Sequence, residues 1–362
     1  MTITRLDLTY FRNFDSLAVD FAPGVNIFYG NNGSGKTNLL EALFVFMLGR
    51  SQRGAPDAVL TKHDQPFYRL EGTLDDGSRC PELALAYERG GRKRITLDGV
   101  GIKLAELYRH FCAVAAGPED TAILTAAPST RRQFLDMYLS QYSVKYLADL
   151  ADYQKALAQK NAALKNNMDP TPFDVIVASV GARVMTARRA FLRDVAAHAG
   201  THYAQIADGE TMTVTYRPSV GLGDDDLDTD AIERRIVATL ERYRDRERAM
   251  NVALVGPHRD DIHFEIGGYP ARTHGSQGQL RTAAIALKLA VYHILKERRN
   301  QPPILLLDEI FAELDDTRTM GLVRAFDSFT QLFLTTAVTP PDDLAANSRN
   351  FRIRNGAIEE MH

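Results

Sequence analysis

The chain has 362 residues, of which 45% are hydrophobic and 25% are charged, as is typical of a folded globular protein. Because one hydrophobic core usually stops growing below this length, two lobes are expected. The formal net charge of −3 excludes a uniformly basic coat, so any nucleic-acid surface must be a local patch.

The sequence shows no sign of export or of membrane insertion. Its first residues lack the basic and apolar regions of a secretory signal. No stretch approaches the roughly 18 uncharged apolar residues that a membrane-spanning helix requires. The two cysteines, Cys80 and Cys112, form neither a disulfide framework nor a metal-binding spacing, so a cytoplasmic location is expected.

The chain begins with a predicted β-hairpin and a glycine-rich loop. Residues 3–10 alternate as in a strand, and residues 17–21 are the expected partner strand. After the apolar run Val25–Tyr29 come a glycine, four free positions and then Gly-Lys-Thr. This spacing is the phosphate-binding loop of P-loop nucleotide hydrolases, and the helical pattern that follows it directs its positive dipole end at the phosphates.

Each residue of this loop has an expected role. The glycines let backbone N–H groups surround an anion. Lys36 is expected to reach the β- and γ-phosphates, and the Thr37 hydroxyl is expected to bind Mg²⁺. The predicted nucleotide-binding residues here are Gly30, Asn31, Asn32, Gly33, Ser34, Gly35, Lys36, Thr37 and Asn38.

The next part of the chain predicts an antiparallel sheet and then a helical arm. Short alternating segments between Phe67 and Leu97, separated by glycine-containing turns, indicate a sheet added to the nucleotide core. Apolar residues then recur at helical spacing over Arg131–Lys165 and over a second segment of similar length. The Pro-containing turn between them predicts an antiparallel αα-hairpin with arms of about 50 Å.

The nucleotide core is expected to resume after a charged helix that begins near Asp230 and ends near Met250. The run Ile304–Leu307 has the composition of a fully buried strand in a helix-covered parallel sheet, and residues 331–336 are a second candidate. The predicted architecture is therefore one lobe split in sequence, residues 1–115 and 255–362, with a helical lobe, residues 116–254, inserted between its parts.

Asp308 and Glu309 directly follow the buried run Ile304–Leu307. This is the expected place for the second acidic motif of a P-loop protein. Asp308 would hold Mg²⁺, and Glu309 would orient or deprotonate the attacking water. The predicted catalytic residues are Glu309, Lys36 and Asp308.

Ser276-Gln277-Gly278-Gln279 opens a predicted helix about 30 residues before Asp308. The segment resembles the Ser-Gly-Gly-Gln signature of ABC-type ATPases, which binds the γ-phosphate held by another subunit; Gln277 departs from the commonest form. Glu313–Asp316 resembles the loop that crosses the dimer seam in those proteins. The resemblance adds Ser276, Gln277, Gly278, Gln279 and Asp315 to the expected nucleotide-binding residues. A polar helix cap is the alternative interpretation of the first segment.

Over essentially its full length the chain resembles the RecF family of bacterial recombination mediators, which are SMC-like ABC-type ATPases. The resemblance rests on the Phe11–Phe14 corner, the P-loop and Gly49-Arg50-Ser51, and above all on two segments that transporters lack: Gly117–Asp136 and Gly256–Asp261. It implies an α/β fold in which an ABC-type P-loop ATPase lobe with an antiparallel β add-on carries an inserted α-helical arm lobe.

Two features of the ABC pattern are absent. There is no clear glutamine near Ala113–Asp120, and Thr335-Thr336 stands where the switch histidine is expected. Both absences favour slow hydrolysis suited to timing, and the resemblance to the RecF family implies that DNA stimulates it.

The resemblance implies the function as well. ATP and Mg²⁺ would be the cofactors, and an ATP-dependent homodimer would clamp duplex, gapped or junction DNA. RecR would be the partner, with RecO, in loading RecA at single-strand gaps, in replication restart and in the SOS response. The candidate DNA contacts are Arg50, Arg53, Lys62, Arg89, Arg92, Lys93, Arg94, Arg131 and Arg132.

Three other functions remain open at this point. An ABC transporter's ATPase subunit is disfavoured by the missing histidine and by Gln277. A long SMC-type tether is disfavoured because the arm is too short to bridge distant DNA segments. A nucleotide-gated scaffold that does not hydrolyse ATP is the third alternative.

Overall fold

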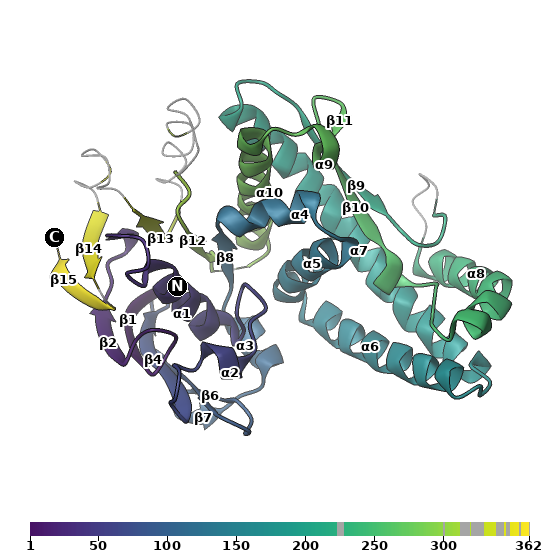
Figure 1. The fold of residues 1–362 in the computed structure, drawn as a ribbon, viewed down its shortest axis with the longest axis horizontal. Helices are drawn as coiled ribbons and strands as arrows, with labels where there is room; N and C mark the ends of the chain where they lie inside the picture. Colours follow the sequence, from purple (N-terminus) through teal and green to yellow (C-terminus); the bar gives the residue numbers. More distant parts are fainter. Residues whose placement is uncertain are drawn as a thin grey trace. The chain divides into compact units, whose positions relative to one another are not determined.

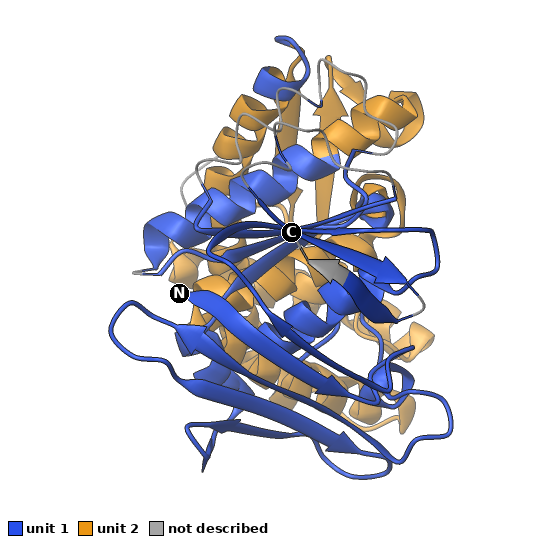
Figure 2. Cartoon of the chain, turned by 90° about the vertical axis from the view of Figure 1, so that its left-hand side faces the viewer, with its two compact units in different colours: residues 1–120, 205–209, 284–362 blue, residues 121–204, 210–283 orange. Residues whose placement is uncertain are grey.

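The computed structural model describes residues 1–222, 228–299, 301–311, 319, 329–337, 344, 348–354 and 356–361. The chain divides into two compact units (Figure 2): unit 1 comprises residues 1–120, 205–209 and 284–362, and unit 2 comprises residues 121–204 and 210–283. None of the described helices is long and apolar enough to cross a membrane.

This division differs from the expected lobes. Residues 116–120 and 205–209, expected in the helical lobe, group with unit 1, whereas residues 255–283 group with unit 2 and not with the nucleotide core. The reason is strand pairing. Strand β10 (Asp261–Ile266) pairs antiparallel with β9 (Met212–Arg217), so that Phe264 lies opposite Val214. The segment that was expected to reopen the nucleotide core is thus part of a small sheet in the helical unit.

Unit 1 contains two six-stranded sheets. The first is antiparallel and has the order β2-β1-β4-β5-β6-β7. The N-terminal hairpin and the expected add-on sheet are therefore one sheet, because β1 pairs with β4. Its strands are β1 (Thr2–Thr9), β2 (Ser16–Asp20), β4 (Phe67–Asp75), β5 (Glu82–Glu88), β6 (Arg94–Leu97) and β7 (Val100–Gly101).

The second sheet has the order β15-β14-β3-β13-β12-β8, and all neighbours are parallel except β15 and β14. Figure 1 labels its strands β8, β12, β13, β14 and β15. The predicted buried strands are confirmed: every residue of β12 and of β13 is buried. The strands are β3 (Gly24–Tyr29), β8 (Ala113–Ala116), β12 (Ile304–Leu307), β13 (Gln331–Thr336), β14 (Ser348–Arg354) and β15 (Ala357–Met361).

Helix α1 (Lys36–Leu48) contacts strands of both sheets. It is buried without interruption from Leu39 to Leu48, as expected of a helix that is apolar around its whole circumference. The Gln331 side chain also joins the sheets, because its amide accepts the Ile3 N–H and donates to the Ile3 carbonyl, both at 2.8 Å. The other helices of the unit are α2 (Asp57–Leu60), α3 (Leu104–His110) and the 3₁₀ helix η1 (Pro118–Thr121).

Unit 2 is mainly helical, with the three-stranded sheet β11-β10-β9. Helix α10 (Gln277–Arg298) begins in this unit, and its residues from 284 onward belong to unit 1. The remaining elements are α4 (Ala122–Thr125), α5 (Pro128–Tyr142), α6 (Val144–Lys165), α7 (Thr171–Ile206), α8 (Thr229–Met250), η2 (Pro257–Arg259), β11 (Tyr269–Pro270) and α9 (Ala271–His274).

The prediction of one continuous helix from Arg131 to Lys165 was wrong. The helix is interrupted at Ser143, whose backbone is extended and whose hydroxyl accepts the Tyr146 N–H at 3.2 Å. A serine that caps the next helix stops the previous one without disturbing the apolar spacing, so the periodicity alone did not reveal it. The first arm of the hairpin, α6, has 22 residues and is therefore about 33 Å long.

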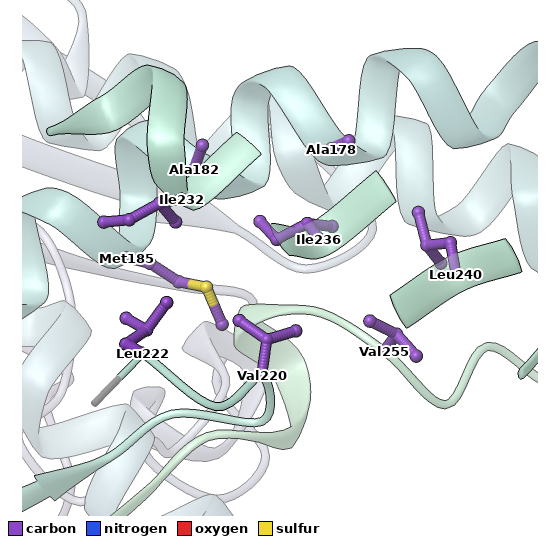
Figure 3. Packing of buried hydrophobic residues seen from close by; sticks show 9 residues of the cluster. All are labelled: Ala178, Ala182, Met185, Val220, Leu222, Ile232, Ile236, Leu240 and Val255. Carbon is purple, nitrogen blue, oxygen red and sulfur yellow. The ribbon is translucent and has the colours of Figure 1, made fainter. Parts of the chain in front are cut away.

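Helices α7 and α8 are held together by an apolar cluster (Figure 3). Ala178 and Ala182 of α7 allow the two helices to approach closely, and Ile232 and Ile236 of α8 fill the space beside them. The cluster also contains Met185, Val220, Leu222, Leu240 and Val255.

A buried polar network forms the second stabilising element of unit 2. Arg188 of α7 is 2% exposed and forms ion pairs with Asp136 at 2.7 Å and with Asp260 at 3.3 Å. It also donates to the Tyr146 hydroxyl and to the Pro257 carbonyl. Burial raises the pKa of Asp260, which the Arg188 charge counteracts.

Replacing Arg188 with methionine is expected to destabilise unit 2 by about 3–5 kcal/mol, because the buried Asp260 carboxylate and the partly buried Asp136 carboxylate lose their cation. In a unit of this size the melting temperature should fall by roughly 10 °C. The control is Arg193→Met on the same helix, where the side chain is 72% exposed and little change is expected. Equal melting temperatures for the two variants would show that the ion pairs of Arg188 do not stabilise unit 2.

Candidate functional site

The glycine-rich loop connects β3 to α1 and takes backbone conformations that favour glycine. Gly30, Gly33 and Gly35 have φ angles of 141°, 78° and 111°. A Cβ atom on Gly30 would lie 2.3 Å from the Ile353 carbonyl oxygen, so no other residue fits there without a backbone shift. Helix α1 begins at Lys36, directly after the loop, and the N–H groups of a first helical turn are directed outward, where helix N-termini bind anions.

Lys36, the first residue of α1, is 4% exposed. Its ammonium donates to the carbonyls of Gly30 at 2.8 Å and Asn31 at 3.2 Å. It also forms an ion pair with Glu309 at 3.1 Å. The lysine is thus aligned along the inside of the loop, and the predicted pairing of the loop with the acidic motif exists in space.

Asp308 is held from three directions at the end of β12. Its N–H donates to the Ala116 carbonyl of β8 at 2.8 Å. Its Oδ1 atom accepts the hydroxyls of Thr37 at 2.9 Å and Thr335 at 2.7 Å. The Thr37–Asp308 bond joins residues 271 positions apart, which sequence order alone does not bring together.

Glu309 has a φ of 46°, in the left-handed region that costs a non-glycine residue roughly 1–2 kcal/mol. Such strain is typical of functional positions. The surroundings fix the conformation: the Glu309 N–H donates to the Thr335 hydroxyl at 2.9 Å, and its Oε2 accepts the Ala337 N–H at 2.9 Å.

The donor set fits a magnesium–nucleotide complex. Mg²⁺ prefers oxygen ligands and is usually held by one or two carboxylates together with substrate phosphates. The Thr37 hydroxyl and the Asp308 carboxylate supply two hard oxygens side by side. The described residues contain no group of three or more acidic, histidine or cysteine side chains that could hold a metal without such help. Within the described chain, the buried Ser34 hydroxyl of the loop has no hydrogen-bond partner, which is consistent with an anion site.

The signature-like segment lies at the start of α10, and its residues form a capping box. The Ser276 hydroxyl accepts the Gln279 N–H at 3.2 Å, and the Gln279 side chain accepts the Ser276 N–H at 2.9 Å. Gln279 also donates to Glu210 at 2.5 Å. Ser276 and Gln277 are exposed, and Gly278 is partly exposed. The polar-cap interpretation is therefore correct as local structure, and it leaves Ser276 accessible at the surface. Asp315 lies outside the described residues.

Comparisons with known proteins agree with this geometry. A family model described as the RecF/RecN/SMC N-terminal domain matches residues 2–354. The DNA replication and repair protein RecF of Symbiobacterium thermophilum is 36% identical over 370 residues, covering 99% of this chain and 98% of its own. The chain belongs to the RecF family.

Solved structures give the same result. The structure of a recombination mediator protein RecF with ATP, from the RecFOR pathway, superposes with a TM-score of 0.91 at 30% identity and covers 100% of this chain and 97% of its own. An Smc head bound to the C-terminal winged-helix domain of ScpA shares only the fold, with a TM-score of 0.58 at 14% identity.

Three segments that carried the RecF resemblance meet at one buried ion pair. Arg12 of the Phe11–Phe14 corner forms a two-pronged contact with Glu41 of α1, at 2.7 and 3.0 Å. Ser51 donates to the same carboxylate at 2.6 Å. Sequence reasoning did not find this cluster, although a signal was present: Glu41 is a lone acid in an otherwise apolar helix.

The two segments that distinguish the RecF family from transporters also meet, inside unit 2. Arg131 is 4% exposed and holds Asp261 through two hydrogen bonds, at 2.6 and 3.1 Å. Arg132 donates to the Asp260 carbonyl at 2.8 Å. Burial lowers the pKa of His258 to about 4. Its Nε2–H faces the Ala253 carbonyl, so its Nδ1 accepts the Tyr153 hydroxyl at 2.6 Å.

The structure separates the candidate DNA contacts into engaged and exposed side chains. Arg131 and Arg132 are engaged as described above. Arg50 lies over the Tyr108 ring, Lys62 pairs with Asp15 at 2.7 Å, and Lys93 pairs with Asp57 at 2.6 Å. Arg53 is exposed but lies beside the acidic motif, with its guanidinium 3.4 Å from the Glu119 carboxylate and 3.9 Å from the Asp308 carboxylate. Arg89, Arg92 and Arg94, around the β5–β6 turn, are exposed, and the Arg89 guanidinium also donates to the Gln65 carbonyl at 2.7 Å.

Substituting methionine for Arg12 is expected to leave the Glu41 carboxylate, which is 0% exposed, buried without its cation. The expected loss of stability of unit 1 is about 3–5 kcal/mol, measured by urea unfolding.

The matched control is Arg5→Met. Arg5 also pairs with acids, Asp7 and Asp20, but its side chain is 45% exposed, so little change is expected. If the Arg12→Met protein were as stable as the Arg5→Met protein, the buried Arg12–Glu41 ion pair would not stabilise unit 1.

Proposed function

We propose that this chain is an ATP-dependent DNA-binding protein of recombinational repair, which closes as a dimer over two ATP molecules and hydrolyses them slowly. The observation that carries the proposal is the convergence of the P-loop with the acidic motif: Thr37 lies 2.9 Å from Asp308, and Lys36 lies 3.1 Å from Glu309. Membership in the RecF family and the likeness to a RecF–ATP structure support it.

Each side chain has a role in the proposed reaction. The loop N–H groups and Lys36 bind the phosphates. Thr37 and Asp308 hold Mg²⁺, which neutralises charge on the β- and γ-phosphates. Glu309 orients the attacking water and accepts its proton.

We propose that a second copy of the chain completes the binding site of the γ-phosphate. The Ser276 hydroxyl caps α10 and is exposed, so it and the helix N-terminus can bind an anion carried by a partner. Two copies related by a two-fold axis would form two such sites with the same surfaces. Because the triphosphate binds the closed dimer more tightly than open subunits, ATP favours closure and hydrolysis favours opening.

DNA is proposed to bind the closed dimer through phosphate contacts. Arg89, Arg92 and Arg94 are exposed candidates around the β5–β6 turn of unit 1, and such contacts give binding that is independent of base sequence and sensitive to salt. By family membership we propose RecR and RecO as partners in loading RecA at gaps, with roles in replication restart and the SOS response.

Replacing Glu309 with glutamine is expected to preserve ATP binding, because the amide keeps the shape of the side chain, and to abolish proton acceptance. Light scattering at saturating ATP and Mg²⁺ should therefore show a lasting dimer. The same Glu309→Gln chain carrying Ser276→Arg should bind ATP but remain a monomer, because the added side chain occupies the place of the partner's phosphate.

Two results would count against the proposal. A monomeric Glu309→Gln protein with ATP bound would remove the clamp, and a dimeric double variant would remove the role of Ser276. A phosphate-release assay on the unmodified protein, with and without duplex DNA, separates slow hydrolysis from a scaffold that does not turn over.

A further inference from the structure

The end of β13 occupies the place where ABC-type ATPases carry a switch histidine. Here the chain reads Thr335-Thr336-Ala337. Strand β13 pairs in parallel with β12, with Leu334 beside Leu307. Thr335 and Asp308 directly follow these two residues, so they lie at the same edge of the sheet. Thr335 is 0% exposed.

The Thr335 hydroxyl joins both residues of the acidic motif. It donates to Asp308 Oδ1 at 2.7 Å and accepts the Glu309 N–H at 2.9 Å. The direction of both bonds follows from chemistry, since an ionised carboxylate can only accept and an amide N–H can only donate. One buried hydroxyl therefore fixes the carboxylate of one acid and the backbone of the next.

We propose that Thr335 is a positioning residue for ATP hydrolysis, which holds Asp308 in the orientation that binds Mg²⁺ and holds Glu309 in its strained backbone conformation. This inference rests on the proposed ATPase function. Asp308 Oδ1 accepts hydroxyls from both Thr37 and Thr335. If the Thr37 hydroxyl were to bind Mg²⁺ in place of Asp308, the bond from Thr335 would still orient the carboxylate. Removing a residue that orients a metal ligand in this way typically lowers metal affinity or activity by roughly 10–100-fold.

The decisive comparison is between Thr335→Val and Thr335→Ser. Valine keeps the shape of threonine and removes the hydroxyl, whereas serine keeps the hydroxyl. Binding of a fluorescent ATP analogue is titrated with Mg²⁺, and again in EDTA. For Thr335→Val the Mg²⁺ concentration at half-maximal tightening should rise roughly 10-fold or more, with kcat lowered by a similar factor. Binding in EDTA should be unchanged.

Thr335→Ser should match the unmodified protein in the Mg²⁺ titration and in kcat, which a purely space-filling role of Thr335 would not predict. Thr335→Ala removes the hydroxyl without a second methyl group and takes the place of valine if that variant does not fold. An unchanged Mg²⁺ midpoint and kcat for the hydroxyl-free variant, or equal defects for valine and serine, would overturn the inference.

The unmodified protein separates this inference from the function on which it rests. If it shows neither Mg²⁺-dependent ATP binding nor turnover, both the proposed function and the role of Thr335 fail. If it shows both activities and Thr335→Val equals it, only the role of Thr335 fails.

Discussion

The candidate nucleotide-binding site depends on the hydrogen bonds that the Asp308 carboxylate accepts. Its Oδ1 atom accepts hydroxyls from Thr37, at the start of α1, and from Thr335, at the end of β13. These segments are far apart in sequence, and they meet because β13 lies between β3 and β12 in the sheet. The carboxyl ends of neighbouring parallel strands meet at one edge, which is where open α/β sheets bind ligands.

Helix α1, which follows the glycine-rich loop, is anchored through a buried carboxylate. Helix α1 is buried between two sheets, and such a helix needs a partner for any charge that it carries. Glu41 has two: the Arg12 guanidinium and the Ser51 hydroxyl. The corner before β2 and the loop after α1 are thereby attached to the helix that begins at Lys36, directly after the glycine-rich loop.

Local sequence patterns predicted those parts of the fold whose structure is determined by residues close together in the chain. The P-loop and the buried strands Ile304–Leu307 and Gln331–Thr336 could be placed from spacing and composition. The break at Ser143 could not, because capping of one helix by a serine leaves the apolar period intact. Exposure of single arginines could not be predicted either: Arg131 is buried against Asp261, an acid 130 positions away.

The same limit applies to the candidate site. Sequence suggested which residues bind the nucleotide, but the link from Thr335 to both acids required the strand order. In the absence of a switch histidine, a threonine inside the same chain holds the acidic motif. We expect this arrangement to position the acids before a second copy arrives, so that closure of the dimer adds Ser276 to a site that is already formed.

The central claim is that each triphosphate is bound by two copies, and site-directed cross-linking tests it most directly. One copy carries Asn32→Cys in the P-loop and the other carries Gln277→Cys beside Ser276; both positions are exposed, and the exposed Cys80 is replaced by serine in both. With ATP and Mg²⁺, a short thiol linker should join the differently tagged copies, and without nucleotide it should not. No cross-link between copies at saturating ATP would contradict the account.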